Sequence, residues 1–144
     1  MKNYFQVRHI KNLLAHKHFC LWLAEFWTLL IAVLCLENSK KLPSIGIKSA
    51  DKYVHFTFYF VFTILWFLYL IKKNSHIKNT VNRVLIKVFL AALFYGVLIE
   101  IAQTVFTVSR KGDVLDVLAN TTGSVTAVFL LRLYDTTFRK EKIK

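Results

Sequence analysis

The chain has 144 residues, 56% of them hydrophobic, and a formal net charge of +12. Its length suits one domain, and its long apolar runs indicate an integral membrane protein rather than a soluble one. The basic residues lie between the apolar runs, which indicates membrane topology rather than a nucleic-acid partner, and no zinc-finger spacing or Gly-rich phosphate loop suggests a cofactor.

The first apolar run predicts a membrane span over residues 19–36, preceded by a basic cytoplasmic segment at 1–18. About 18 residues is near the minimum for crossing a bilayer core of ~30 Å. Glu25 lies inside this span and must face protein, reach the interface or be protonated. Cys20 and Cys35 lie about 22 Å apart on a helix that rises roughly 1.5 Å per residue, so we expect two unpaired, buried thiols.

The second span is predicted over residues 53–71, directly after Asp51 and Lys52. Side chains that recur every four residues share one face of this helix. They are Asp51, His55, Tyr59 and Thr63. Asp51 could instead cap the helix, and His55 and Tyr59 could be interfacial anchors. Their alignment with Asp51 favours a shared functional face.

A basic loop at 72–87 precedes the third span, which is predicted over residues 88–108. One face of this helix carries Gly96, Glu100, Gln103 and Thr107. An uncompensated carboxylate inside a membrane helix is costly, so Glu100 indicates a built site.

A short turn, Ser109–Asp113, leads into the fourth span, predicted over residues 114–134, and makes the last two spans antiparallel neighbours. The stripe on the fourth span has polar residues at one end and small residues at the other. It consists of Asp113, Asp116, Asn120, Gly123 and Ala127. Small residues let membrane helices approach closely, so we assign Gly96 and Gly123 to helix packing. Residues 135–144 form a basic cytoplasmic tail.

Basic residues are distributed unevenly between the two ends of the predicted spans. Of the 20 Lys and Arg residues, 14 lie in segments 1–18, 72–87 and 132–144. The positive-inside rule then predicts an antiparallel, all-α bundle of four spans in the inner membrane, with both termini in the cytoplasm. The polar stripes would descend from the outer face. They predict an outward-open funnel with Lys52 and Arg110 at its rim and Glu100 near its floor.

The polar residues also form a joint pattern. It reads Asp51-Lys52-x-x-His55-x-x-x-Tyr59, then Glu100-x-x-Gln103, then Arg110-x-x-Asp113-x-x-Asp116-x-x-x-Asn120-x-x-Gly123. Over roughly residues 40–134, this pattern resembles the VanZ-like family of small bacterial membrane proteins. The resemblance implies a multi-span helical protein of the bacterial envelope, with one VanZ-like domain over 19–134. The family's namesake is associated with teicoplanin resistance, so a role in glycopeptide antibiotic tolerance is also implied. Because this chain is a bare four-span unit, resistance need not carry over.

The funnel carries more charge than helix packing requires, since packing needs only amides such as Gln and Asn. We therefore expect it to bind or modify a cell-envelope lipid, glycan or glycopeptide at the outer leaflet. Arg and Lys suit phosphate or carboxylate groups. The predicted ligand-binding residues are Lys52, Tyr59, Gln103, Arg110 and Asn120.

A membrane enzyme is the first alternative. His55 with Asp51 or Asp113 could supply a base and its orienting carboxylate for chemistry on a phosphate-containing lipid or glycan, and a desolvated Glu100 could act as a general acid. The candidate catalytic residues are Asp51, His55, Glu100, Asp113 and Asp116. Only one histidine lies in the funnel, so we predict no metal ligands there.

The second alternative is a structural role. Polar bonds between membrane helices contribute about 0.6–2 kcal/mol each, so several could hold four short helices together. Apart from membrane lipid, no partner is specified by a motif. A homodimer is compatible with the small volume that four short helices enclose.

Overall fold

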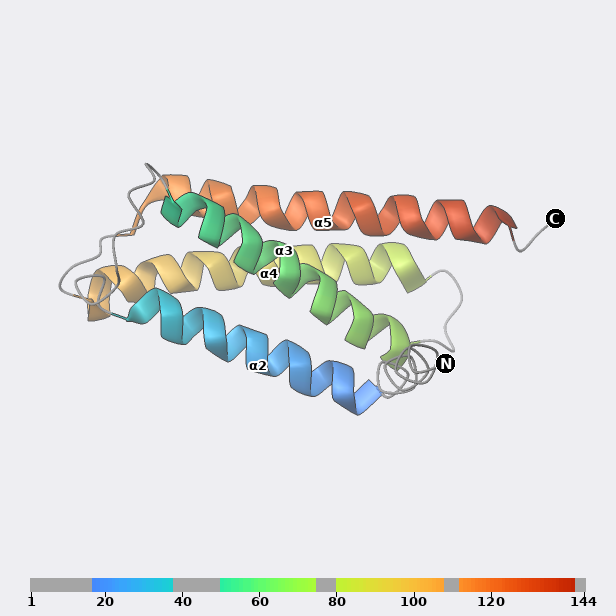
Figure 1. Ribbon diagram of the computed structural model, residues 1–144, viewed down its shortest axis with the longest axis horizontal. Helices are drawn as coiled ribbons and strands as arrows, with labels where there is room; N and C mark the ends of the chain where they lie inside the picture. The colour runs from blue at the N-terminus through green and yellow to red at the C-terminus, as the bar shows by residue number, and fades with distance from the viewer. Residues whose placement is uncertain (1–16, 38–49, 75–79, 108–111, 142–144) are drawn as a thin grey trace, which may run out of the picture.

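The computed structural model describes residues 17–37, 50–74, 80–107 and 112–141 of the chain. The ordered elements in these ranges are all helices: α2 (Lys17–Leu36), α3 (Ala50–Lys73), α4 (Thr80–Phe106) and α5 (Val114–Glu141). Successive helices run in opposite directions (Figure 1). Each is long and apolar enough to cross a membrane, which confirms the predicted all-α membrane fold.

The helices extend beyond the predicted spans. α4 begins at Thr80 rather than at residue 88, and α3 begins at Ala50, so that Asp51 and Lys52 lie in its first turn. α5 continues through residues assigned to the tail. Hydropathy shows where a helix can meet lipid, whereas backbone hydrogen bonding continues into the polar flanks. This extension sets Lys52 on a rigid helix rather than in a loop.

α3 is the central helix of the bundle. It packs most extensively on α5 and also contacts α2 and α4. The apolar core beneath the polar end is formed by side chains from α2, α3 and α4. It includes Ile31, Cys35, Tyr59, Phe62, Ala92 and Ile99. Cys20 and Cys35 are both buried and are not joined in a disulfide, as the sequence predicted.

Polar bonds between helices tie α2 to its neighbours. The indole of Trp27 donates to the Phe58 carbonyl at 2.9 Å, and the Tyr95 hydroxyl donates to the Thr28 carbonyl at 2.7 Å. The Gln103 side chain donates to the Cys35 carbonyl at 3.0 Å. Such bonds matter in a membrane because lipid supplies no competing partner.

Two glycines lie at helix crossings. A Cβ at Gly123 would overlap the backbone carbonyl of Phe56, so α5 can approach α3 this closely only with glycine there. A Cβ at Gly96 would lie 3.3 Å from Asn120 Nδ2 and 3.4 Å from Tyr59 Cε1, which is tight but not an overlap. Gly123 therefore allows the backbones of α3 and α5 to approach closely.

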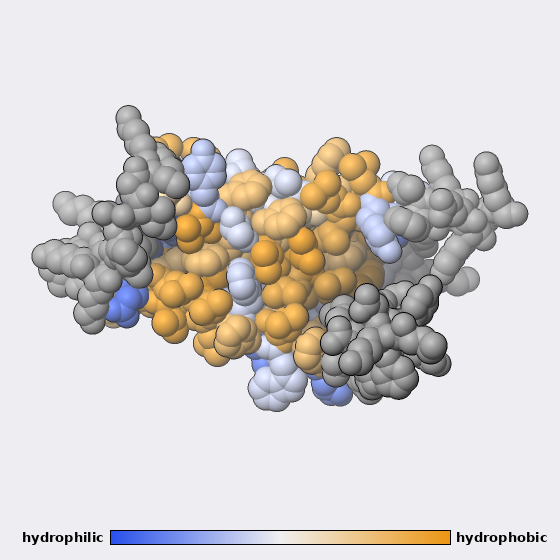
Figure 2. All heavy atoms as spheres, in the orientation of Figure 1, coloured by the Kyte–Doolittle hydropathy of each residue, from blue (hydrophilic) through white to orange (hydrophobic). Residues whose placement is uncertain are grey.

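The outer surface of the bundle is apolar. Figure 2 shows hydrophobic side chains over the middle of the molecule. Large apolar residues such as Trp22, Phe94 and Phe129 are more than half exposed, which suits a lipid environment and would be unfavourable in water. Glu25 is also exposed, on the outward side of α2.

Candidate functional site

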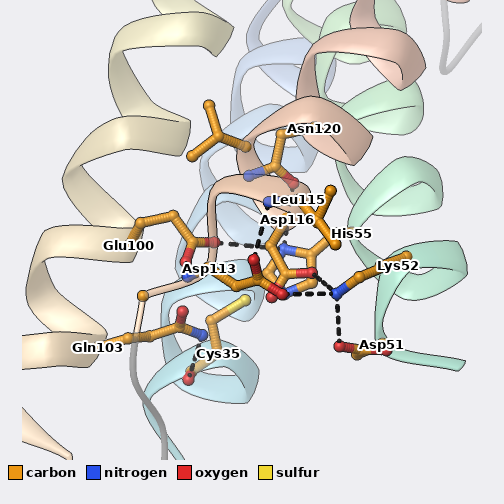
Figure 3. Close-up of polar contacts among 12 residues, drawn as sticks. Cys35, Asp51, Lys52, His55, Glu100, Gln103, Asp113, Leu115, Asp116 and Asn120 are labelled. Carbon is orange, nitrogen blue, oxygen red and sulfur yellow. Dashed lines mark hydrogen bonds and ion pairs between the residues drawn. The ribbon is translucent and has the colours of Figure 1, made fainter. Parts of the chain in front are cut away.

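The polar stripes meet at one end of the bundle, where α3 and α5 begin and α4 ends (Figure 1). Figure 3 shows side chains from these three helices pointing toward one another. The predicted convergence of the stripes is therefore present in the structure. The residues brought together are Asp51, Lys52, His55, Glu100, Asp113, Asp116 and Asn120.

Lys52 is bound by three carboxylates. Its ammonium donates to Asp51 Oδ2 at 3.0 Å, Asp113 Oδ2 at 2.9 Å and Asp116 Oδ1 at 2.8 Å. An ammonium has three donors, so these contacts can occupy all of them. Lys52 thus joins α3 to the start of α5, and in this arrangement its donors are not directed at a phosphate.

Asp113 organises the start of α5. Its Oδ1 accepts the backbone N–H of Leu115 at 2.9 Å, as an N-cap residue does. That N–H, and then the ammonium of Lys52, hold the pKa of the Asp113 carboxyl below its usual value. The backbone N–H of Asp113 donates in turn to Glu100 Oε2 at 3.0 Å. Glu100 therefore fixes the α4–α5 turn as well as contributing charge.

His55 lies on α3, buried between α4 and α5. Its Nδ1 lies 3.1 Å from Asn120 Oδ1 and 3.9 Å from Glu100 Oε1. Its Nε2 lies 3.8 Å from Asp116 Oδ2. Because an amide oxygen only accepts, the Asn120 contact requires a proton on Nδ1. In the neutral ring, Nε2 is then an acceptor that faces Asp116.

Among the described residues, three buried polar atoms in and below the polar cluster have no hydrogen-bond partner: Tyr59 Oη, Glu100 Oε1 and Asn120 Nδ2. Glu100 is only 6% exposed and Asn120 only 2%. Buried polar atoms in proteins are nearly always paired, so a group of unpaired ones points to a ligand or an ion.

A shallow cavity of about 220 Å³ lies between α4 and α5, next to the polar cluster. Its lining combines polar and apolar groups: Glu100, Ile101, Thr104, Gly112, Asp113, Val114 and Val117. Two of these lining residues are bonded to each other, since the Gly112 N–H donates to Thr104 Oγ1 at 2.9 Å. A carboxylate pair beside exposed apolar side chains suits an amphiphile better than a purely polar ligand.

Comparison with protein-family models identifies the family. The model for VanZ/LLP1 matches residues 3–135, which is most of the chain. The chain belongs to the VanZ/LLP1 family. No curated protein and no solved structure matches it. Membership confirms the resemblance predicted from the polar pattern, and it places the site in a VanZ/LLP1 membrane bundle.

Some predicted residues have other positions in the VanZ/LLP1 bundle. Gln103 is directed toward α2, where it bonds the Cys35 carbonyl, and Tyr59 lies deeper, beside Gly96. Arg110 lies outside the described residues. Sequence reasoning missed Thr104, although it is one helical turn after Glu100 and so on the same face.

Proposed function

We propose that this VanZ/LLP1 protein binds the polar group of a cell-envelope lipid, lipid-linked glycan or glycopeptide in the cavity between α4 and α5. The cavity's lining carries the proposal. The lining includes the carboxylates of Glu100 and Asp113 and the apolar side chains of Ile101, Val114 and Val117. The headgroup of an amphiphile would contact the carboxylates, and its chain would contact the apolar side chains.

The charge of the site supports a particular ligand chemistry. At this end of the bundle, the described residues include three carboxylates bound to the Lys52 ammonium and a fourth, Glu100, that accepts the Asp113 N–H. This end of the bundle therefore presents mainly acceptors. Hydroxyl or amino groups, which donate hydrogen bonds, fit such a surface, and glycans, amino headgroups and glycopeptides carry them.

The side of the membrane follows from the distribution of Lys and Arg. The end opposite the site carries Lys72, Lys73, Arg83 and Arg132. We place that end in the cytoplasm and the cavity at the outer leaflet of the inner membrane. Tolerance to a glycopeptide antibiotic is compatible with a ligand captured there.

A catalytic role is the second candidate, and the geometry of His55 favours it. Asn120 orients the ring, and Nε2 faces the carboxylate of Asp116 at 3.8 Å. Such a ring can exchange a proton with a bound hydroxyl group. Chemical turnover of the bound lipid or glycan would distinguish a catalytic role from binding alone.

Native mass spectrometry of the protein released from bacterial membranes tests the proposal. Wild-type protein should retain an envelope lipid or glycolipid adduct. Val117→Trp should lose it, because the indole fills the cavity lined by Val117. Leu118→Trp is the matched control, since Leu118 is exposed on α5 and does not line the cavity. Equal adducts in both variants, or none in the wild type, would refute the proposal.

A further inference from the structure

We propose that His55, Glu100 and Asp116 form a binding site for one divalent metal cation of the Zn²⁺ or Mn²⁺ class. Each residue offers one ligand atom, and these atoms lie within 4.8 Å of one another. All three residues are buried. The cation's role in holding an oxygen of the bound ligand rests on the proposed function. The binding of the cation by the protein does not.

In each of these three side chains, one atom is held by a hydrogen bond and another faces the other two side chains. Asn120 holds His55 Nδ1 and leaves Nε2 as the acceptor. The ammonium of Lys52 holds Asp116 Oδ1, while Asp116 Oδ2 faces His55 Nε2. Anchoring of this kind is typical of metal ligands, whose second atom is bonded by an outer partner.

Glu100 gives the strongest sign of an absent partner. Its Oε2 accepts the Asp113 N–H, but its Oε1 is buried without any hydrogen bond and lies 3.9 Å from His55 Nδ1. A buried carboxylate oxygen with no partner is costly, particularly at the depth of a membrane helix. A cation between the three side chains would satisfy it.

The charge and the donor set indicate the kind of cation. Four carboxylates against one ammonium leave an excess of negative charge among the described residues of the polar end, which a divalent ion would offset. One imidazole nitrogen and two carboxylate oxygens suit Zn²⁺ or Mn²⁺, whereas Mg²⁺ prefers oxygen and water. Three protein ligands leave a coordination position open for an oxygen of the bound headgroup.

Titration of the purified full-length protein with ZnCl₂ and MnCl₂ alone tests the site. The protein is prepared in detergent without a histidine tag and treated with a chelator. Calorimetry should show one cation per chain, and His55→Gln should weaken its affinity at least tenfold. His18→Gln is the matched control, because His18 is exposed at the far end of α2. Binding that is absent, or equal in His55→Gln and wild type, would overturn the proposal.

A second measurement, on the wild-type protein, tests the site even if His55→Gln fails to fold. Electron paramagnetic resonance of Mn²⁺ bound to the wild-type protein should show coupling to one histidine nitrogen, and its absence would overturn the proposal. The cavity variant Val117→Trp distinguishes the two proposals. It should lose the lipid adduct yet bind the cation with wild-type affinity, since Val117 is not part of the His55, Glu100 and Asp116 group.

Discussion

At the scale of single residues, the site is held together by pairs that cross from one helix to another. Lys52 on α3 binds Asp113 and Asp116 at the start of α5, and Glu100 on α4 accepts the Asp113 N–H. These contacts couple the polar end to the packing of the bundle. A change in one charge should therefore affect stability as well as binding.

Lys52→Met should lower the free energy of unfolding by about 1–2 kcal/mol, because three carboxylates would lose their shared partner in a partly exposed site. Thermal unfolding in detergent, followed by tryptophan fluorescence, measures the change. Lys87→Met, at an exposed position of α4, should have little effect.

A double variant tests whether the loss comes from uncompensated charge. Lys52→Met with Asp116→Asn should cost less than the sum of the single changes, since the second substitution removes one of the carboxylates left unpaired. Strict additivity would show that Lys52 and Asp116 do not interact in the folded protein.

At the scale of helices, the close crossing of α3 and α5 sets the geometry of the site. Gly123 allows this approach, because a Cβ there would overlap the Phe56 carbonyl. His55 and Asn120 are each within three residues of this crossing. Their 3.1 Å contact therefore depends on how closely the two helices pack.

Gly123→Ala should destabilise the bundle by about 1–3 kcal/mol, as overpacking of a tight contact does. Gly96→Ala is the matched comparison and should cost less, because its nearest neighbours are side-chain atoms at 3.3 and 3.4 Å. Unfolding of both variants under the same detergent conditions gives the ranking. A larger loss for Gly96→Ala would contradict the packing described here.

Helix identity and the shared polar faces were predictable from the sequence, whereas the pairing of charges was not. Asp51, His55, Glu100 and Asp116 converge because their spacing repeats with the helix. Lys52 was expected at the funnel rim as a contact for a phosphate or carboxylate group of a ligand. Its binding to three carboxylates depends on how the ends of α3 and α5 meet, which spacing along one chain does not specify.

Helix ends and the role of Gln103 were also beyond sequence reasoning. Hydropathy locates apolar windows, so the polar first turns of α4 were assigned to a loop. Gln103 shares a face with Glu100, yet it bonds α2, because a helix in a bundle has neighbours on more than one side. The sequence predicted which face is polar, but not which neighbour each polar group meets.

At the scale of the whole molecule, the side of the membrane that the polar end faces decides which ligands can reach the site. The site lies at the end of the bundle opposite the end of α3 that carries Lys72 and Lys73. The positive-inside rule favours the cytoplasm for such a cationic end. We therefore propose, as the central claim, that the site opens to the outside of the cell.

Cysteine accessibility in intact cells tests this claim most directly. Single cysteines replace Ser109, Ile45 or Asn79 in a Cys20→Ala, Cys35→Ala background and are treated with an impermeant maleimide. We expect labelling at Ser109 and Ile45 and none at Asn79, since in the sequence Ile45 lies between α2 and α3 and Ser109 between α4 and α5, whereas Asn79 lies between α3 and α4. The reverse pattern would place the cavity in the cytoplasm and contradict an outer-leaflet ligand.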